Sequence, residues 1–405
     1  MLSRRGRSIL IVGDGIGGTA TALACAAKAG IRSTLIGPAR EEGPDYWIGL
    51  WRPAIERLKL LGIIDDERIQ REGVFMKGAG YRSGYRGDWL ARPSRPLNER
   101  ERSLFFVRES TLLSALRRHV SRIPSIDYVE DMVVNAKRAD GRYALEVESG
   151  ETIEPGDVLV LADGTRSKTR DLLDVPNMMR YRGYHVYRGI SRFDSTDRSS
   201  FQSWGPGARF ACVPVGPDQQ MWFATQVRDE ATAEELDGAR DRGADVLEDA
   251  KRLLRGWHDP IEKMLDRTDP NTVVRQAAVE TYGDSRSESG DFGLYRVGDC
   301  ARCLDPIMAV GAGLAVVDAF VVARTVAFDD DGDGAFAAQD SYVRDLRRLS
   351  DMSQRFGQIE SPLLCSFRDA IMRSAPGKAK SIVFDWLMDI PTAARYDLGS
   401  LEPWR

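Results

Sequence analysis

The chain has 405 residues, a length that predicts about two or three domains. Its 61 acidic residues outnumber the 57 basic ones and give a formal net charge of −4, so no basic excess is present to bind a phosphate backbone. This balance argues against a nucleic-acid partner. With 42% hydrophobic and 29% charged residues, the composition is typical of a globular protein and excludes a fibrous or disordered chain.

The sequence also argues against a membrane span and an oxidising compartment. Its most apolar run, residues 307–317, ends at Asp318 and is shorter than the roughly 20 residues that a span needs. The apolar segment 9–12 behind the N-terminal arginines is too short for a signal peptide. Five cysteines in a chain of this length do not form a disulfide framework. We therefore expect a cytoplasmic protein.

The first forty residues predict a strand, a glycine-rich turn, a helix and a second strand. The first strand is Ser8–Val12, the helix covers residues 19–29, and the second strand covers 33–36. The turn between them matches G-x-G-x-x-G in the strand-to-helix setting that dinucleotide-binding proteins use. Its glycines allow a tight turn, close approach of a pyrophosphate and close packing of helix on strand. The predicted cofactor-binding residues of this turn are Gly13, Gly15, Ile16, Gly17 and Gly18.

One expected element of a dinucleotide site is missing. An acidic residue that binds the adenosine ribose normally ends the second strand, about 20 residues after the glycines. Gly37 stands at that position, so Arg40 or Glu41 is left as the candidate for ribose recognition. Asp14, inside the glycine-rich turn, is also unusual, because a carboxylate beside a pyrophosphate is unfavourable unless it points away.

Two later segments repeat the pattern of a strand followed by a turn. The strand Val158–Leu161 leads into Asp163 and Gly164. A strand at 293–297 leads into Asp299 and Pro306, after which an apolar helix opens. The first residues of that helix are Gly311, Ala312 and Gly313.

The region between these two segments has a different character. Residues 184–190, 209–213 and 220–225 alternate like strands, and residues 231–254 form a charged helical stretch. We interpret it as an inserted sheet domain, and we expect a helical tail after Ser341.

The order of these motifs resembles the group A FAD-dependent aromatic hydroxylases and monooxygenases, which have the p-hydroxybenzoate hydroxylase fold. Residues 47–61 are similar to the segment that follows the second strand in that family, and residues 203–225 resemble its substrate-domain sheet. Residues 256–260, Gly-Trp-His-Asp-Pro, are similar to the salicylate- and urate-hydroxylase-like branch.

The resemblance implies an α/β fold. A discontinuous Rossmann-type FAD domain would enclose an inserted antiparallel substrate sheet and precede a C-terminal helical region. The expected division is FAD-binding segments 1–75, 105–178 and 283–345, a substrate-domain excursion at 76–104, a substrate sheet at 179–282 and a helical region at 346–405.

The resemblance also implies roles for particular residues. Asp299 would accept a hydrogen bond from the ribityl chain, and the loop from Pro306 to Gly313 would present a helix N-terminus to the flavin edge that becomes anionic on reduction. Asp163 and Gly164 would face the cofactor phosphates and the nicotinamide nucleotide. A plain helix-capping role is the alternative for both aspartates. The family's cofactor-binding arginine corresponds to Arg108 or, one residue on, to Glu109.

Several positions depart from the family pattern. Arg302 replaces a common histidine, Ala309-Val310-Gly311 replaces Gly-Gln-Gly, and Leu161 replaces a glycine. These departures cluster on the loops expected around the flavin. They leave an atypical affinity for FAD open, as well as a supply of reduced flavin from a partner reductase.

The implied reaction is hydroxylation or epoxidation of an aromatic or unsaturated small molecule. NAD(P)H would reduce the FAD, and O₂ would add to give a C4a-hydroperoxide. Two alternatives remain, a flavin oxidase or dehydrogenase and a FAD-holding protein without turnover. A halogenase is disfavoured because the chain has no W-x-W-x-I-P segment.

The alternating strands also supply candidates for the substrate pocket. We expect His185 and Pro306 to take part in catalysis, and four aromatic or cationic residues are candidates for substrate contacts: Tyr184, Arg188, Phe210 and Trp222. Successive residues of a strand point to opposite faces, so about half of these side chains must point away from any pocket.

Two further motifs have simpler interpretations. Cys300 and Cys303 form a C-x-x-C, which we interpret as packing in a cofactor loop and not as a redox dithiol. Residues 329–340 read D-x-D-x-D-G-x₅-D, close to an EF-hand loop, but aspartate stands where the last glutamate belongs, and a turn between two helices is the better interpretation. No metal site or G-x-S-x-G hydrolase motif is expected.

Overall fold

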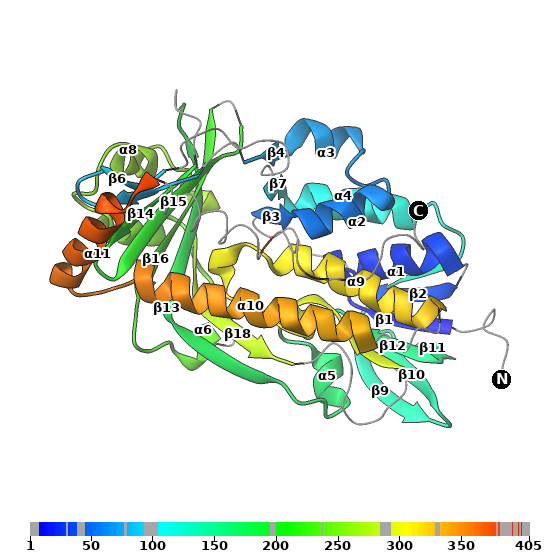
Figure 1. Ribbon diagram of the computed structural model, residues 1–405. Coiled ribbons are helices and arrows are strands. Elements are labelled where there is room, and N and C mark those ends of the chain that lie inside the picture. The colour runs from blue at the N-terminus through cyan, green and yellow to red at the C-terminus, as the bar shows by residue number, and fades with distance from the viewer. Residues whose placement is uncertain are drawn as a thin grey trace.

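The computed structural model describes residues 8–29, 31–38, 45–76, 79–92, 104–194, 200–216, 218–236, 238–283, 293–328 and 333–377, together with 380, 391, 396 and 398. Two halves lie side by side and are bridged by one long helix (Figure 1). One half is built on a parallel sheet and the other on a large, mainly antiparallel sheet. Among the described residues, no helix is both long and apolar enough to cross a membrane.

The first half is organised around five parallel strands. Their order is β19 (Leu294–Arg296), β12 (Val158–Leu161), β1 (Ser8–Val12), β2 (Arg32–Gly37) and β8 (Ile126–Glu130). The predicted strand at Ser8–Val12 and the predicted strand at Val158–Leu161 form with the expected bounds.

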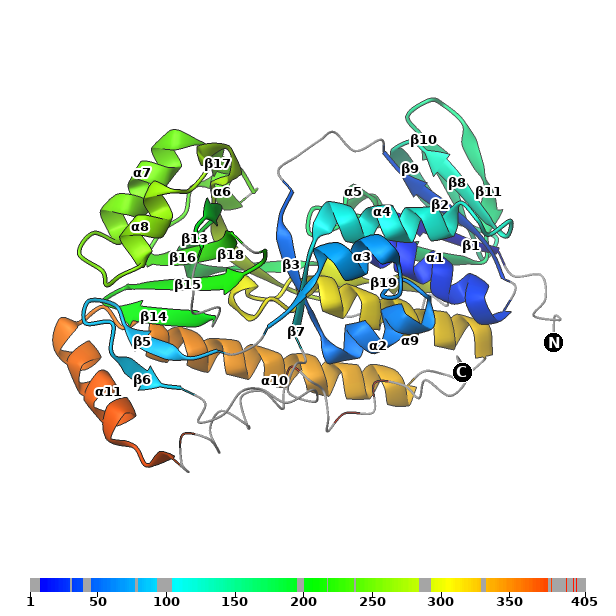
Figure 2. The same ribbon diagram turned by 90° about the horizontal axis from the view of Figure 1, so that it is seen from above.

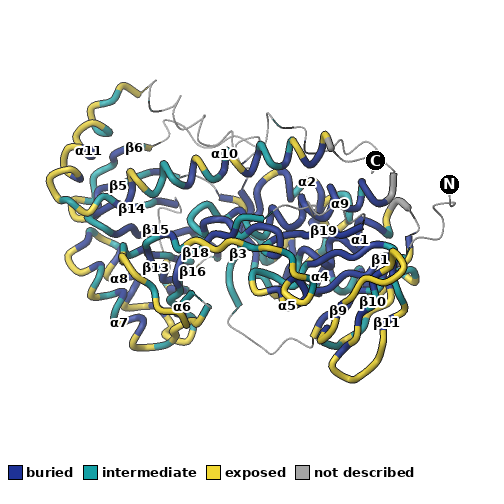
Figure 3. The backbone as a smooth tube through the Cα atoms, turned by 90° about the horizontal axis from the view of Figure 1, so that it is seen from below, coloured by how far each residue is buried: buried dark blue, intermediate teal, exposed yellow. Residues whose placement is uncertain are grey.

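Both faces of the parallel sheet are covered by other elements, and successive side chains of β1 point alternately into the two cores. Ile9 and Ile11 pack in a core with α1 (Ile16–Ala29), α4 (Glu109–Val120) and α9 (Gly311–Phe328). Leu10 and Val12 point the other way, into a core with β9 (Val133–Ala139), β10 (Arg142–Val147) and β11 (Thr152–Gly156). Figure 3 shows β1, α1 and α9 as largely buried, whereas the β9–β10 hairpin carries exposed residues. The helix α9 is the apolar helix that the sequence predicts.

The second half contains an eight-stranded sheet. Its order is β17 (Asp241–Arg242), β18 (Val274–Tyr282), β13 (Met178–Arg192), β16 (Gln219–Val227), β15 (Ala208–Pro214), β14 (Phe201–Gly205), β5 (Tyr81–Ser83) and β6 (Trp89–Ala91). The strands β5 and β6 come from the predicted excursion at 76–104 and pair with β14 and with each other. One face of the sheet packs against α7 (Ala244–Leu253) and α8 (Ile261–Asp266). The short α6 (Ala233–Leu236) and β17 interrupt the helical stretch predicted at 231–254.

A smaller three-stranded sheet lies between the halves. Its strand order is β3 (Trp47–Trp51), β7 (Leu104–Arg108) and β4 (Val74–Phe75). The helices α2 (Arg52–Leu60) and α3 (Glu67–Glu72) lie next to these strands in the chain. In the view from above, β3 and β7 stand at the junction of the two halves (Figure 2).

The bridging helix is α10 (Asp333–Gly357), which is followed by α11 (Pro362–Ser374). Tyr342, Val343 and Leu346 belong to a core shared with α9 and the small sheet. Toward its C-terminal end, Ser353 binds Arg209 of the large sheet: the Ser353 carbonyl accepts a hydrogen bond of 2.6 Å. The helix runs through the boundary that we predict at residues 345 and 346, so this boundary does not coincide with an end of an element.

Candidate functional site

Three loops of the predicted site meet at the carboxyl end of the parallel sheet. Because β12 pairs with both β1 and β19, the residues that follow these three strands are neighbours. Gly13 follows β1, Asp163 follows β12, and Gly298 with Asp299 follows β19. Ligands of open α/β sheets bind at this edge.

The glycine-rich turn is packed too tightly for side chains at its ends. Gly13 has a φ of +106°, and a Cβ at this position would overlap the carbonyl of Ala162. A Cβ on Gly18 would overlap the carbonyl oxygen of Gly13. Gly15 directly precedes α1, which begins at Ile16. This arrangement fits a pyrophosphate at the N-terminus of α1.

Asp14 points away from that helix N-terminus. Asp14 is 2% exposed, and its side chain forms an ion pair with Arg117 of α4 and accepts a hydrogen bond of 3.0 Å from the Tyr128 hydroxyl of β8. Burial raises the pKa of Tyr128 to about 12, and the charge of Asp14 and its hydrogen bond contribute further. The unfavourable carboxylate is thus neutralised inside the protein. The predicted ribose-binding alternatives, Arg40 and Glu41, lie outside the described residues.

Asp163 is only partly used as a helix cap. Its Oδ2 accepts a hydrogen bond of 3.3 Å from the backbone N–H of Thr169, whereas the N-cap residue of α5 (Lys168–Leu172) is Ser167. Its Oδ1 is buried and has no hydrogen-bond partner in the part of the chain that the structure describes. Gly164 follows with a φ of +86°. A buried acceptor without a donor fits a ligand at this turn.

Asp299 lies against the first residue of α9. A Cβ on Gly311 would be 3.6 Å from Asp299 Oδ1. Burial, with the charges of Glu109 and Asp318 adding to it, raises the pKa of Asp299 to about 6. Across the described ranges, no hydrogen bond to this carboxylate is present. The carboxylate therefore fits a donor supplied by a bound ligand, such as the ribityl hydroxyls of FAD.

Replacing Asp299 by asparagine is expected to have opposite effects on stability and on FAD binding. Because the folded-state pKa is raised, the native protein holds the proton more tightly, and the stability of the wild type falls as the pH rises from about 4 to about 6. The variant lacks this loss, so without FAD it should be more stable than the wild type at pH 8 by about 1–2 kcal/mol. At pH 5 the difference should be smaller.

The measurement is urea unfolding of both proteins without FAD at pH 5 and pH 8, together with FAD titration. The FAD affinity of the variant should fall by about tenfold or more, because a charged acceptor is lost. An equal stability difference at both pH values would contradict the raised pKa.

Arg302, which departs from the family histidine, holds the Gly298–Asp299 turn in place. Its guanidinium binds Asp318 at 3.2 Å and Asp340 at 3.3 Å. Asp318 in turn accepts a hydrogen bond of 2.8 Å from the backbone N–H of Gly298, and another from the Gln339 side chain. Arg302 therefore balances the buried charge that anchors the turn.

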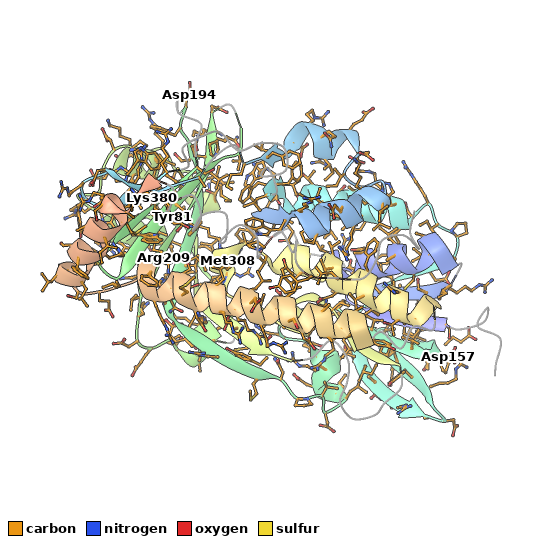
Figure 4. The ribbon with its side chains drawn as sticks, viewed as in Figure 1. Tyr81, Asp157, Asp194, Arg209, Met308 and Lys380 are labelled. Carbon is orange, nitrogen blue, oxygen red and sulfur yellow. The ribbon has the colours of Figure 1, made fainter. Side chains whose placement is uncertain are left out.

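The loop after Asp305 is tied to the large sheet by a buried ionic network. Asp305 accepts hydrogen bonds from Ile307 N at 3.0 Å, from Arg182 Nε at 3.0 Å and from the Tyr184 hydroxyl. Glu280 binds the same arginine at 3.3 Å and accepts a hydrogen bond of 3.2 Å from the backbone N–H of Asp305. These bonds place the 3-10 turn Pro306–Met308 between the halves, where Figure 4 labels Met308.

Two features of this loop also fix its conformation. Ala309 adopts a left-handed conformation with a φ of +50°. The indole of Trp51 donates a hydrogen bond of 3.1 Å to the carbonyl of Met308.

Strand register divides the predicted substrate residues between the two faces of the large sheet. Arg188 pairs with Phe223 and Gly189 with Trp222, so Arg188 and Trp222 point in opposite directions. Tyr184 lies on the same face as Arg188 and reaches Asp305.

Three of the predicted substrate or catalytic residues lie on the other face, which is a correction to the expectation that they line the pocket. Phe210 and Trp222 stack with ring centroids 6.1 Å apart, in the core with α7 and α8. His185 is fully buried, and its Nε2 lies 3.0 Å from Glu235 of α6. Burial lowers the pKa of His185. Arg188 and Tyr184 are the candidates that remain on the face toward the parallel-sheet half.

Arg188 belongs to a small cationic group that sequence reasoning missed. The guanidinium groups of Arg188 and Arg240 lie 5.8 and 5.5 Å from the ring centroid of Tyr46. Burial and the charge of Arg240 lower the pKa of Arg188. Tyr46 is held by its carbonyl, which accepts a hydrogen bond of 2.8 Å from the backbone N–H of Glu109. No local pattern marks Tyr46 or Arg240, because they meet only in the folded chain.

Arg108 and Glu109, the two candidates for the position of the family's arginine, stand side by side at the start of α4. Glu109 is the first residue of α4 and is one of the charges that raise the pKa of Asp299. Arg108 binds Asp45 at 3.4 Å and stacks on Trp47 at 5.2 Å. Arg108 and Trp47 line a cleft of about 440 Å³ that opens between the small sheet and the turn joining β15 to β16; its other wall includes Pro214, Val215 and Gln219.

Two sequence motifs do not form separate sites. Cys300 is buried and Cys303 mostly so, and burial raises both thiol pKa values, which opposes a reactive dithiol. Residues 329–332 of the EF-hand-like segment lie outside the described residues, and from Asp333 onward the segment is part of α10. Among the described residues, no group of histidine, cysteine, aspartate or glutamate side chains could hold a metal ion.

Comparison with known proteins gives the following relationships. No family model matches the chain. Aurachin C monooxygenase/isomerase from Stigmatella aurantiaca is 34% identical over 256 residues, which cover 60% of this chain and 64% of that protein. Chloroplastic zeaxanthin epoxidase from Nicotiana plumbaginifolia is 26% identical over 333 residues, which cover 78% of this chain and 48% of that protein. The chain thus spans about half to two thirds of the length of these relatives.

Among solved structures, Klebsiella pneumoniae HpxO in complex with FAD and uric acid superposes with a TM-score of 0.79. Its sequence is 20% identical, and the alignment covers 96% of this chain and 97% of that one. At this identity the likeness concerns the fold, and it agrees with the predicted FAD-domain and substrate-sheet architecture. By sequence, the chain is similar to FAD-dependent monooxygenases, and its fold is that of an FAD-binding hydroxylase.

Proposed function

We propose that the protein is an FAD-dependent monooxygenase that uses NAD(P)H and O₂ to hydroxylate or epoxidise an aromatic or unsaturated small molecule. The observation that carries this proposal is the meeting of the glycine-rich turn, Asp163 and Asp299 at one edge of the parallel sheet, facing a second sheet. Its relatives include a monooxygenase/isomerase and an epoxidase, and HpxO binds FAD and uric acid. The few cysteines further favour a cytoplasmic location.

The described residues would divide the binding of FAD among them. The turn at Gly13–Gly18 would hold the pyrophosphate, Asp299 would accept hydroxyl hydrogen bonds, and the N-terminus of α9 would lie beside the part of the ring that becomes anionic. Bound FAD would supply electrons for the activation of O₂, and one atom of that O₂ would enter the substrate.

The large sheet would provide the substrate side of the site. Arg188 offers a cation on the face toward the FAD half, where Tyr184 is already bound to Asp305. The apolar Val186 and Ala278 pack beside Tyr184 and would help to exclude water. The ionic network around Asp305 would hold the Pro306 loop in one position relative to this sheet.

The test is to purify the protein, add FAD and record the flavin spectrum, then mix the reduced and oxidised complexes with candidate substrates. We expect a 1:1 FAD complex, NAD(P)H oxidation that a substrate stimulates, and incorporation of one oxygen atom from ¹⁸O₂. Bleaching of the flavin by substrate without NAD(P)H and without oxygen would instead identify an oxidase or dehydrogenase. NAD(P)H consumption that no candidate substrate stimulates would favour a binding protein without turnover, and absence of any FAD complex would refute the proposal.

A further inference from the structure

We infer that Arg188 and Arg240 bind a carboxylate of the substrate, so that the protein acts on an aromatic or unsaturated acid. The inference deepens the proposed function and rests on it, because it assumes that the substrate meets FAD between the two halves. It gives a role to the cationic group around Tyr46, which the binding of FAD does not use.

The first observation is that these two cations have no anionic partner. The Arg240 guanidinium donates a hydrogen bond of 3.5 Å to the Tyr46 hydroxyl, and both guanidinium groups lie against the Tyr46 ring. Over the described parts of the chain, neither side chain forms an ion pair. Burial, and after it the charge of Arg240, lowers the pKa of Arg188. Holding two cations together without an anion costs free energy, which a bound carboxylate would offset.

Two other buried arginines of the large sheet show how the protein holds a cation that serves its structure. Arg182 forms an ion pair of 3.0 Å with Asp305. Arg209 donates a hydrogen bond of 2.6 Å to the carbonyl of Ser353. The Arg188 guanidinium has neither a carboxylate nor a carbonyl acceptor within the described ranges. Its surroundings are therefore those of a cation that binds a ligand.

The cationic group also lies beside the proposed flavin site. Tyr46 directly precedes β3, and β3 packs on the loop that carries Ala309, because a Cβ on Gly49 would lie 3.0 Å from the Cβ of Ala309. Burial raises the pKa of Asp299 and the charge of Arg240 opposes this rise, so these two side chains are close. Asp299 would repel a doubly charged group. A singly charged carboxylate therefore suits the site better than a phosphate.

Arg188 stands at the edge of an apolar surface. Val186 lies two residues earlier on β13 and points to the same face, and Phe223 of β16 is the cross-strand partner of Arg188. Val186 packs with Ala278 and with the partly buried Phe223. A ligand that fills this place needs an apolar body and one charged end, and the planar guanidinium can bind both oxygens of a carboxylate. An aromatic or unsaturated acid has both features.

The experiment compares two pairs of probes on the FAD-loaded protein, salicylate with salicylamide and cinnamate with cinnamamide. The members of each pair differ in the carboxylate, and perturbation of the flavin spectrum measures their affinities. The wild type should bind at least one acid about tenfold or more tightly than its amide. Arg188→Met should weaken that acid about 10- to 100-fold and leave the amide within about twofold. Arg240→Met should weaken the acid about two- to fivefold, because Arg240 is more exposed.

Arg242→Met is the matched control, because Arg242 lies two residues after Arg240 and is exposed. It should change none of these affinities. FAD affinity and thermal unfolding are measured for every variant. Arg188→Met should bind FAD like the wild type and be no less stable, because it removes a cation that has no protein acceptor among the described residues. Arg188→Lys, which keeps the charge but loses the planar fork, should retain part of the preference for the acid.

Four outcomes would overturn the inference. The first is a wild-type protein that binds neither acid more tightly than its amide, and the second is a preference that survives in Arg188→Met. A loss of FAD affinity in Arg188→Met that equals its loss of acid affinity would assign the cation to FAD. A raised KM for NAD(P)H with an intact preference for the acid would assign it to the dinucleotide phosphates. The proposed function would stand in each of these cases, whereas a wild-type protein that binds no FAD would refute the proposed function itself.

Discussion

Replacing Arg182 by methionine is expected to lower the free energy of unfolding by about 3–5 kcal/mol, the range seen when one partner of a buried ion pair is removed. The Arg182 side chain is 2% exposed and binds Asp305, Glu280 and Asp351. Asp305 and Glu280 are as deeply buried as the arginine, so methionine would leave two carboxylates in a low-dielectric interior without a cation. Urea unfolding at pH 7.5 measures the loss.

Arg180→Met is the matched control, because Arg180 lies two residues earlier on the same strand and is exposed. It should change stability by less than about 0.5 kcal/mol. A loss below 1 kcal/mol at pH 7.5 would mean that the network does not join the Pro306 loop to the large sheet.

Replacing Gly18 by alanine is expected to abolish FAD binding and to destabilise the parallel-sheet half by about 3 kcal/mol or more. The added methyl group would overlap the carbonyl oxygen of Gly13, and because this neighbour is backbone, no side-chain rotation can relieve the overlap. The turn must open, and the N-terminus of α1 then moves away from the phosphate position. Thermal unfolding and FAD fluorescence quenching report the two effects.

Gly334→Ala is the control for this change, because a Cβ at Gly334 would meet no atom within 4 Å. Gly334 lies in α10, where alanine favours the helix, so this variant should be as stable as the wild type or slightly more stable. If Gly18→Ala binds FAD with wild-type affinity, the turn is not the phosphate site.

The parts of the fold that local sequence determines were the predictable ones. The strand Ser8–Val12, the turn at Gly13 and the helix behind it are encoded within about twenty-five residues, and both the glycine spacing and the run of apolar residues reflect their packing. The sequence also shows that the usual ribose-binding acid is missing, because that acid normally ends the second strand at a fixed distance from the glycines and Gly37 stands at this position. The sequence did not predict that the side chain of Asp14 fills the space beside Gly37, because the two residues become neighbours only when β1 and β2 pair.

The substrate side could not be predicted at the level of single residues. Tyr184 and His185 are neighbours in sequence, yet register alone decides that the first reaches Asp305 and the second reaches Glu235. Arg182 and Asp305 are separated by 123 positions, and nothing near either one reveals the partner. Arg240 meets Tyr46 in the same way, across a stretch of chain that crosses both halves.

The helix α10 has a mechanical consequence. Its 25 residues make a rod about 37 Å long, attached to the FAD half near its N-terminal end through Phe336 and Gln339 and to the substrate sheet near its C-terminal end through Asp351 and Ser353. A continuous helix resists bending, so the halves cannot swing apart about a flexible linker along this side. We therefore expect substrate entry and product release to use local displacement of loops, because α10 holds the two halves at a fixed spacing along this side.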